Sequence, residues 1–363
     1  MKKLHELKKL LQRGKIDALL VTQPENRRYL SGYTATDSSI AESSGVLLIP
    51  RSGAPLLLTD SRYELHAGHE AAGFEIVLYP KGLLSLLEKL LPGLGIKRLG
   101  FESHYMLYDT ALKLTALTAK LDIKALPLAG LIEKMRLRKE QEEIARIEKS
   151  VLLNEAVFQE VFATLRPGET EREVAMRIEN TMLRMGAERP SFATIVAGGP
   201  NGAAPHAVPG SRPLQQGEPI VIDMGLILDG YCSDMTRTVV LGTPDQKTVH
   251  LFRLVRRAQL AATAAIKAGI TGRAADRAAR EVISRAGLGD RFGHGLGHGV
   301  GLAVHEGPSL NRRNGRKLQP GMIITVEPGV YLPGWGGIRL ENMVVVRDDG
   351  CTCLNRDTAF LDI

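Results

Sequence analysis

The sequence predicts an α+β protein with two domains, a smaller α/β domain over residues 1–127 and a larger, pseudo-symmetric domain over residues 128–363. Three observations lead to this prediction. The chain has 363 residues, more than one hydrophobic core usually organises. Its first third alternates between helix-like and strand-like patterns. Its later part repeats a set of helix caps and glycines at one constant offset.

The first third alternates short apolar runs with segments whose apolar residues recur at helical spacing. Helices are expected at residues 1–13, 83–91 and 110–119, and strands at residues 17–21, 45–50, 55–59 and 98–102. This alternation is typical of a small α/β domain, which we expect to end near Pro127.

A charge-rich segment over residues 134–149 follows this domain. Its apolar residues Ile144, Ile147 and Val151 recur at helical spacing, which predicts a linker that leads into a long helix. A basic helix could bind a membrane or a calmodulin-like partner. A solvated helix connecting the two domains is the favoured interpretation.

The second domain contains an internal repeat. Two segments each begin with a glycine and a threonine suited to cap a helix, and each ends with a glycine suited to terminate one. The first set is Gly168, Thr170 and Gly186, and the second, at the same offset throughout, is Gly269, Thr271 and Gly287. Each copy then leads into a glycine-rich stretch with a histidine. We expect two related halves with one ligand cleft between them.

Charge and composition exclude several classes of function. The net charge of +7 is spread thinly, with short basic runs at residues 2–3, 8–9 and 136–139. Clustered basic residues with interleaved aromatics, as nucleic-acid binding requires, are missing from the sequence. These runs are interpreted as a solvated basic surface, and no nucleic-acid partner is expected.

Cysteine usage and hydropathy indicate the compartment. The three cysteines, Cys232, Cys351 and Cys353, form an odd and sparse set, which favours reduced thiols in a cytoplasmic protein. No apolar run of signal-peptide or membrane-spanning kind follows the N-terminus. No membrane partner is therefore expected.

Two aspartates flank a predicted hairpin turn. Asp223 ends the β-branched run Ile220–Asp223, Asp234 lies in the next strand-like segment, and Asp229–Gly230 is a turn signal between them. The two strands are expected to pair, so that both carboxylates face one side. A lone aspartate at a strand end is usually a cap or a solvated edge residue. Two carboxylates close together in an apolar setting repel each other and require cations.

The segment over residues 291–306 is rich in glycine and histidine. Its glycines allow close approach of backbones, and its histidines are His294, His298 and His305. The alternating glycines resemble a dinucleotide-binding fingerprint. That fingerprint should follow a first strand and open a βαβ unit, whereas this segment follows a predicted helix late in the chain. Metal binding is the favoured interpretation.

Two glutamates complete the pattern. Glu327 ends an apolar run before Pro328–Gly329, and Glu341 lies beside a fully apolar run. Arg339 could satisfy one buried carboxylate, but it cannot easily satisfy four. Four carboxylates and one imidazole favour Mn²⁺, Co²⁺, Fe²⁺ or Zn²⁺, and four negative charges balance two divalent ions. Two such ions about 3.5–4 Å apart can share a bridging hydroxide as a nucleophile.

These residues resemble those of the pita-bread metallopeptidases, which include Xaa-Pro dipeptidase, aminopeptidase P and methionine aminopeptidase. Five ligand positions occur in order at family-like spacings. The segments over residues 26–33 and 59–63 are similar to the creatinase-like N-terminal domain of the proline-specific branch. The resemblance implies a pita-bread domain over residues 128–363 that hydrolyses Xaa-Pro bonds of dipeptides or short peptides, with Mn²⁺ foremost and as a homodimer.

The resemblance also implies roles for individual residues. Asp223 is expected to chelate one metal ion, Asp234 and Glu341 to bridge the two, and His298 and Glu327 to complete the second. Glu327 is further expected to shuttle a proton from the bridging water to the leaving nitrogen. Contacts with the substrate are expected from His206, His294, His305 and Arg339. Asn342 stands where many relatives carry an acid.

Two other classes of function remain open from the sequence. One is a metal-independent, creatinase-like C–N hydrolase or lyase acting on a small metabolite. The other is a binding module that kept the fold and lost catalysis. The complete ligand set counts against both. The sequence does not separate a dipeptidase from an aminopeptidase that accepts longer peptides.

Overall fold

The computed structural model describes residues 2–361 and divides the chain into two compact units, Met1–Met135 and Arg136–Ile363. Met1, at the start of the first predicted helix, lies outside the described residues. The sequence placed the domain boundary at residue 127, whereas the structure assigns residues 128–135 to the first unit. Glu133 explains this assignment, because its carboxylate contacts both Asn26 and His104 of that unit.

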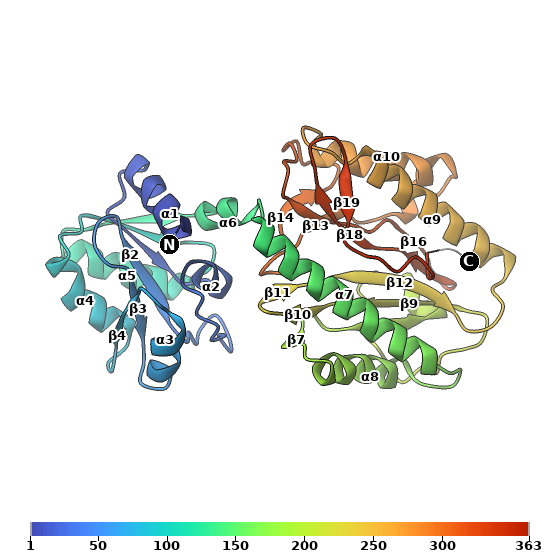
Figure 1. Ribbon diagram of the computed structural model, residues 1–363, viewed down its shortest axis with the longest axis horizontal. Coiled ribbons are helices and arrows are strands. Elements are labelled where there is room, and N and C mark those ends of the chain that lie inside the picture. The colour runs from blue at the N-terminus through green and yellow to red at the C-terminus, as the bar shows by residue number, and fades with distance from the viewer. Residues whose placement is uncertain (1, 362–363) are drawn as a thin grey trace. The chain divides into compact units, whose positions relative to one another are not determined.

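The first unit is an α/β domain, drawn in blue to teal in Figure 1. Its six-stranded sheet has the order β4-β3-β2-β1-β5-β6. β1, β5 and β6 run parallel, as do β3 and β4, while β2 is antiparallel to both of its neighbours. Its helices are α1 (Lys2–Arg13), α2 (Pro24–Ser31), α3 (Glu64–Glu70), α4 (Leu83–Gly93), α5 (Tyr108–Lys120) and α6 (Leu131–Arg136). Its strands are β1 (Ala18–Val21), β2 (Val46–Pro50), β3 (Leu56–Thr59), β4 (Glu75–Leu78), β5 (Arg98–Glu102) and β6 (Lys124–Leu128).

All seven elements predicted for this unit are present, and α2, α3, α6, β4 and β6 are additional. The sequence shows no apolar pattern for α2 because the buried residues of this helix include the polar Asn26 and Arg27. The guanidinium of Arg27 donates to the carbonyls of Ala35 and Gly45 and pairs with Asp37 at 3.0 Å. Polar anchoring of this kind leaves no hydrophobic periodicity in the sequence.

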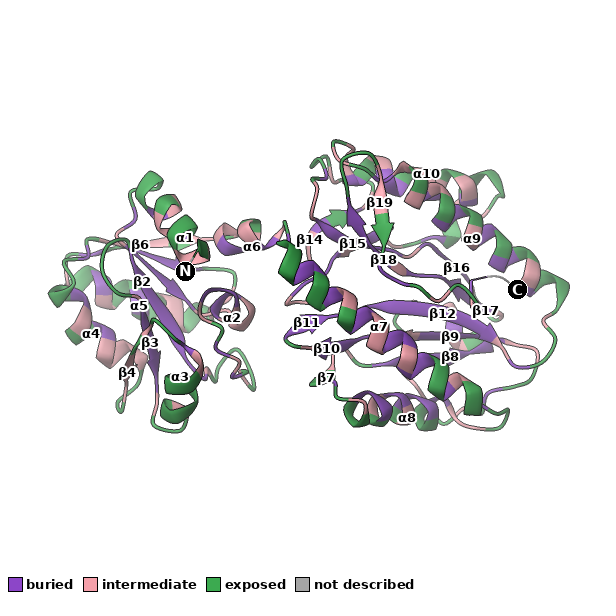
Figure 2. Cartoon of the chain, viewed as in Figure 1, coloured by how far each residue is buried: buried purple, intermediate pink, exposed green. Residues whose placement is uncertain are grey.

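The second unit places helices outside several antiparallel sheets, with the strands largely buried between them (Figure 2). Its helices are α7 (Gln141–Thr164), α8 (Glu171–Arg184), α9 (Gln246–Ala265) and α10 (Gly272–Arg285), with short 3₁₀ turns η1 (Gly199–Ala203) and η2 (Gly289–Arg291). Its strands are β7 (Arg189–Pro190), β8 (Ile195–Gly198), β9 (Pro219–Met224), β10 (Leu226–Leu228), β11 (Tyr231–Cys232), β12 (Met235–Val240), β13 (Gly297–Gly299), β14 (Glu306–Leu310), β15 (Ile323–Val326), β16 (Gly329–Leu332), β17 (Gly336–Arg339), β18 (Asn342–Val346) and β19 (Cys351–Cys353).

Two related halves make up this unit, as the repeat predicted. Thr170 and Thr271 each cap a helix, accepting a hydrogen bond from the backbone N–H three residues on. The glycines that end α8 and α10, Gly186 and Gly287, have φ of 98° and 77°. Such left-handed backbone favours glycine.

Each half has its own hydrophobic core. In the first half, α7 and α8 cover the sheet β12-β9-β8, with Phe158 and Ile178 packed in one core with Ile222. In the second half, α9 and α10 cover the sheet β14-β13-β15-β18-β19, with Phe252 and Ile283 in one core that reaches the strands. The repeated sequence therefore builds a repeated helix-pair-on-sheet architecture.

The glycine-rich segment forms β13, a strand between β14 and β15. A Cβ on Gly297 would lie 2.2 Å from the carbonyl oxygen of Thr325, and one on Gly299 would lie 2.0 Å from that of Gly307. These glycines therefore permit two neighbouring backbones to approach, as the sequence predicted. A strand in this position does not open a βαβ unit, so the dinucleotide interpretation is disfavoured.

One expectation about surface charge is wrong. The sequence predicts a solvated basic run at residues 136–139, but Arg136 and Lys139 are buried. Both side chains form ion pairs with Glu306, and this pairing compensates for the loss of hydration when the charges are buried. Within residues 2–361, the structure contains no helix with the length and apolar character needed to cross a bilayer.

Replacing Gly297 by alanine is expected to lower the free energy of unfolding by about 1–3 kcal/mol, because the new methyl group would overlap the backbone of β15. Chemical denaturation with urea measures the change. Gly293→Ala is the matched control, since a Cβ there meets nothing within 4 Å. Equal midpoints for the two variants would contradict the close-approach argument.

Candidate metal centre

A cavity of about 520 Å³ in the second unit brings together every site residue that the sequence predicted. The cavity is lined by four carboxylates, four histidines and one arginine, together with mainly apolar side chains. The predicted residues on its wall are Asp223, Asp234, Glu327, Glu341, His206, His294, His298, His305 and Arg339. Residues separated by more than a hundred positions therefore meet in one place.

The two aspartates come from paired strands, as expected. β9 and β12 are antiparallel, with Asp223 opposite Thr236, and Asp234 immediately precedes β12. The turn between them uses Asp229 and Gly230, both at positive φ (50° and 81°). Positive φ at both central residues is typical of a type I′ turn, for which Asp-Gly is a preferred pair.

The other three predicted ligands lie on or just beyond strands of the second half. His298 is the central residue of β13, and Glu327 follows the end of β15. Glu341 lies between β17 and β18. Because β13 and β15 are neighbours in one sheet, His298 and Glu327 come close, with Nε2 and Oε1 3.4 Å apart.

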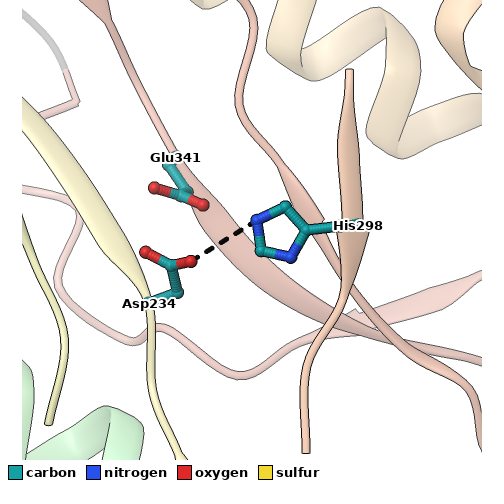
Figure 3. A group of neighbouring side chains, drawn as sticks. All are labelled: Asp234, His298 and Glu341. Atoms are coloured by element: carbon teal, nitrogen blue, oxygen red, sulfur yellow. Dashed lines mark ion pairs between the residues drawn. The ribbon is translucent and has the colours of Figure 1, made fainter. Parts of the chain in front are cut away.

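Three of these side chains form a compact group of donor atoms (Figure 3). One ligand atom from each of Asp234, His298 and Glu341 lies within 4.8 Å of the other two. Nε2 of His298 is 3.5 Å from Oδ2 of Asp234. The residues on β13, before β12 and before β18 thus point toward one common volume.

Asp223 and Glu327 stand beside this group with different partners. Oδ2 of Asp223 accepts a hydrogen bond from Nη2 of Arg339 at 2.7 Å, while its buried Oδ1 has no partner within residues 2–361. Oε1 of Glu327 accepts one from the Thr325 hydroxyl at 3.1 Å. A buried oxygen that accepts no hydrogen bond destabilises the folded state, so Oδ1 of Asp223 is suited to bind a cation.

Electrostatics in the cavity oppose ionisation of Asp234, Glu327 and Glu341. Burial, reinforced by neighbouring carboxylates, raises the pKa of Asp234 and of Glu341 well above the usual range. Burial likewise raises the pKa of Glu327 to about 8. A bound cation would reverse this effect by favouring the charged forms.

The imidazole of His298 is uncharged and oriented with Nε2 toward the other candidate ligands. Burial lowers its pKa to about 4, so the imidazole carries no charge at neutral pH. Its Nδ1 lies 3.1 Å from the Gly299 carbonyl, to which a neutral ring donates its one N–H. The lone pair of Nε2 then faces Asp234 and Glu327. Metal-bound histidines are commonly oriented by a hydrogen bond of this kind.

The donor set fits divalent cations. Carboxylate oxygens with one imidazole nitrogen suit Mn²⁺, Fe²⁺, Co²⁺ or Zn²⁺, and no thiolate lines the described wall of the cavity. Arg339 pairs with Asp223, whereas the carboxylates of Asp234, Glu327 and Glu341 have no cationic partner of their own at hydrogen-bond distance within the described part of the chain. Buried carboxylates in this number are held most readily by metal ions.

Two threonines orient these ligands, and sequence reasoning did not find them. The Thr236 hydroxyl donates to Oε2 of Glu341 at 2.7 Å and accepts from Nε of Arg339 at 3.0 Å. The Thr325 hydroxyl accepts from the backbone of His298 at 3.0 Å. Both threonines lie inside strands, where β-branched residues are common, so their sequence context gave no signal.

Tyr331 on β16 is a third residue that sequence reasoning missed. Its hydroxyl lies 2.9 Å from Nη1 of Arg339 and 2.8 Å from Nε2 of His294. Burial raises the pKa of Tyr331 to about 12 and lowers that of His294 to about 4. Arg339 must therefore donate to the hydroxyl, and the hydroxyl to His294.

The remaining predicted substrate contacts lie nearer to solvent. His206 and His305 are both exposed, and they border the same cavity. The ring of His305 packs edge-on against that of His298 with centroids 4.3 Å apart. Partial desolvation of the ring and the proximity of His206 lower the pKa of His305.

Comparison with known families identifies both parts of the chain. The model of metallopeptidase family M24 matches residues 145–348, and that of the creatinase/prolidase N-terminal domain matches residues 3–138. An uncharacterized peptidase of Bacillus subtilis, YqhT, is 37% identical over 348 residues, covering 96% of each chain.

Solved structures show the same architecture over the full length. An Xaa-Pro dipeptidase from Bacillus anthracis matches with a TM-score of 0.92 and 36% identity, covering 98% of each chain. An X-Pro aminopeptidase from Thermotoga maritima matches with a TM-score of 0.86 and 36% identity, covering 94% of this chain and 96% of that one. The predicted pita-bread domain and the creatinase-like domain before it are thereby confirmed.

In protein stripped of metal by a chelator, the free energy of unfolding is expected to fall by at least about 1 kcal/mol between about pH 5 and pH 8. The folded-state pKa of Glu327 is raised from 4.5 to about 8, so ionisation above pH 4.5 favours the unfolded chain until the pH passes 8. Urea titrations at both pH values measure this loss.

Glu327→Gln should reduce that pH dependence, because the amide does not ionise. Glu88→Gln, at an exposed position of the first unit, should leave it unchanged. Parallel losses in the wild type and in Glu327→Gln would contradict the assignment.

Proposed function

Because the chain belongs to metallopeptidase family M24, we propose that it hydrolyses the Xaa-Pro peptide bond at the N-terminus of dipeptides or short peptides. The observation that carries this proposal is the convergence of four carboxylates and His298 in one cavity. The names of the two similar solved structures, an Xaa-Pro dipeptidase and an X-Pro aminopeptidase, support the proline specificity.

The cofactor is proposed to be a pair of divalent cations, with Mn²⁺ foremost and Co²⁺, Zn²⁺ or Fe²⁺ as alternatives. Asp234 and Glu341 would bridge the pair, with Asp223 on one side and His298 and Glu327 on the other. When bound, such cations polarise a carbonyl group and make water acidic enough to attack it at neutral pH. The free Oδ1 of Asp223 and the closely spaced donor atoms of Asp234, His298 and Glu341 support this assignment.

Side chains of this protein supply the remaining chemistry. Glu327 is proposed to accept the proton of the attacking water and to deliver it to the leaving proline nitrogen. A carboxylate at the edge of the donor group, beside His298 at 3.4 Å, can serve first as a general base and then as a general acid. His206 and His305 are proposed to donate hydrogen bonds to the carbonyl oxygen as negative charge develops on it.

Arg339 acts by holding other groups in place. Its guanidinium contacts Asp223, Thr236, Tyr331 and the Pro205 carbonyl at 2.7–3.1 Å. It thereby links Asp223 to the segment before His206 and to the Tyr331–His294 pair. We propose that this network fixes the positions of Asp223, His206 and His294 relative to one another.

A proline substrate suits a site of this composition. The Xaa-Pro amide has no N–H, so a peptidase that must hydrogen-bond that group cannot use it. The cavity instead presents groups that act on the carbonyl, next to an apolar wall that includes Phe192, Ile195 and Leu310. An apolar wall can pack against the pyrrolidine ring of proline.

Three finer assignments complete the proposal. The enzyme is either a dipeptidase or an aminopeptidase, and it is proposed to act as a homodimer in the cytoplasm. The family resemblance supports the homodimer. The three free cysteines support a reducing compartment.

A length series of substrates tests the function. Purified protein with Mn²⁺ should release the N-terminal residue from Xaa-Pro dipeptides, from Xaa-Pro-Yaa tripeptides, or from both, and should leave Xaa-Ala peptides largely intact. The ratio of kcat/KM between the two lengths decides whether the protein is a dipeptidase or an aminopeptidase. Release from none of these peptides, with the metal bound, would refute the proposal.

Asp234→Asn is expected to reduce kcat/KM at least about 10³-fold, because it removes a proposed bridging carboxylate. Metal content, measured by elemental analysis after gel filtration, should fall in the same variant. Asp229→Asn is the matched control, since it makes the same chemical change in the same hairpin, at a position whose positive φ of 50° asparagine tolerates. Normal turnover in Asp234→Asn would contradict the metal assignment.

A further inference from the structure

A buried cluster of three charged side chains lies outside the proposed catalytic groups. The Glu306 carboxylate accepts from Nη2 of Arg136 through one oxygen and from Nζ of Lys139 through the other, each at 2.5 Å. The side chains of Arg136, Lys139 and Glu306 are only 4%, 3% and 8% exposed. One carboxylate is thus clamped between two cations.

Glu306 follows His305 directly in the chain. It is the first residue of β14, whereas His305 ends an irregular segment that begins after β13. A Cβ on Gly301, within that segment, would lie 2.4 Å from Oε1 of Glu306. The segment therefore folds back against the clamped carboxylate, and the clamp fixes the end that carries His305.

The two cations are themselves held in place. The backbone N–H of Lys139 donates to the Gly321 carbonyl at 2.8 Å, which anchors it beside β15. Leu137 lies against Gly307, where an added Cβ would come within 2.8 Å of the leucine side chain. Arg136 and Lys139 therefore approach Glu306 from a segment that is fixed on two sides.

We propose that Glu306, clamped by Arg136 and Lys139, is a positioning residue that holds the His305 imidazole at the rim of the cavity. The assignment rests on the proposed function in one respect, since it takes His305 as a contact of the substrate. Without the clamp, the irregular segment before β14 is free to rotate the ring away from His298, against which it now packs.

Stability alone does not account for a clamp of this composition. Desolvation of buried ions commonly cancels much of their attraction, and apolar side chains of similar size often stabilise a fold as well or better. Charged hydrogen bonds differ from apolar contacts in being directional. With both oxygens of Glu306 engaged, the carboxylate has one orientation, and the residue before it is oriented too.

A double-mutant cycle separates positioning from simple stabilisation. Glu306→Gln is expected to lower kcat/KM for an Xaa-Pro substrate about tenfold, with unchanged metal content. In a His305→Ala background the same substitution should cost less than about twofold, because the ring that it positions is absent. Equal losses in both backgrounds would overturn the proposal.

The cations offer a rescue and a matched control. Lys139→Met should resemble Glu306→Gln, while Lys139→Arg should recover most of the activity because it restores a buried donor to the carboxylate. Arg138→Met changes an exposed residue of the same basic run and should alter kcat/KM less than about twofold. An equal loss in Lys139→Met and in Arg138→Met would also count against the clamp.

A spectroscopic measurement tests the positioning without any turnover. In protein labelled with ¹³C at histidine Cε1, the His305 signal is assigned by its disappearance in His305→Ala. Glu306→Gln should shift and broaden that signal and leave the signals of distant histidines unchanged. An unmoved His305 signal overturns the positioning role, whereas a wild-type protein inactive on every Xaa-Pro peptide overturns only the proposed function.

Discussion

The mutual repulsion of four carboxylates, two of them buried and two half-buried, is the constraint on which the second unit depends. Asp223, Asp234, Glu327 and Glu341 share one cavity, and Arg339 balances only one of them directly. Burial and mutual repulsion raise the pKa values of three of the four, so folding without cations works against their ionisation. The rest of the unit must hold these groups together against that repulsion, and hydrophobic packing supplies the force.

The two halves meet this demand with strands rather than with flexible loops. Each carboxylate lies on a strand or next to one, where backbone pairing limits its movement. β13 contributes His298 from a strand whose neighbours come so close that glycine is required on both sides of the histidine. Thr236 and Thr325 then fix the rotamers of Glu341 and Glu327. The cleft is therefore preorganised by its framework, which favours metal binding and electrostatic catalysis.

Most of this arrangement could be predicted because it depends on residues that are close together in the sequence. Caps such as Thr170 and turns such as Asp229–Gly230 depend on neighbouring residues, and acids at the ends of apolar runs are visible as such. What could not be predicted depends on distant partners. α2 is anchored by the polar contacts of Arg27, and Tyr331 gains its role only when Arg339 and His294 come together in space.

The burial of the basic run at residues 136–139 also could not be predicted, because it depends on a distant partner. By sequence it resembles any solvated patch, because Glu306, which accounts for two of its charges, lies far along the chain. The cavity gathers negative charge that cations must balance, whereas the clamp gathers positive charge around a carboxylate one residue from His305. Charge is buried in both places, and in both it fixes the direction of side chains that border the cavity. Because hydrophobic contacts lack that directionality, a site needing several side chains in register is expected to bury charge near its rim as well as at its centre.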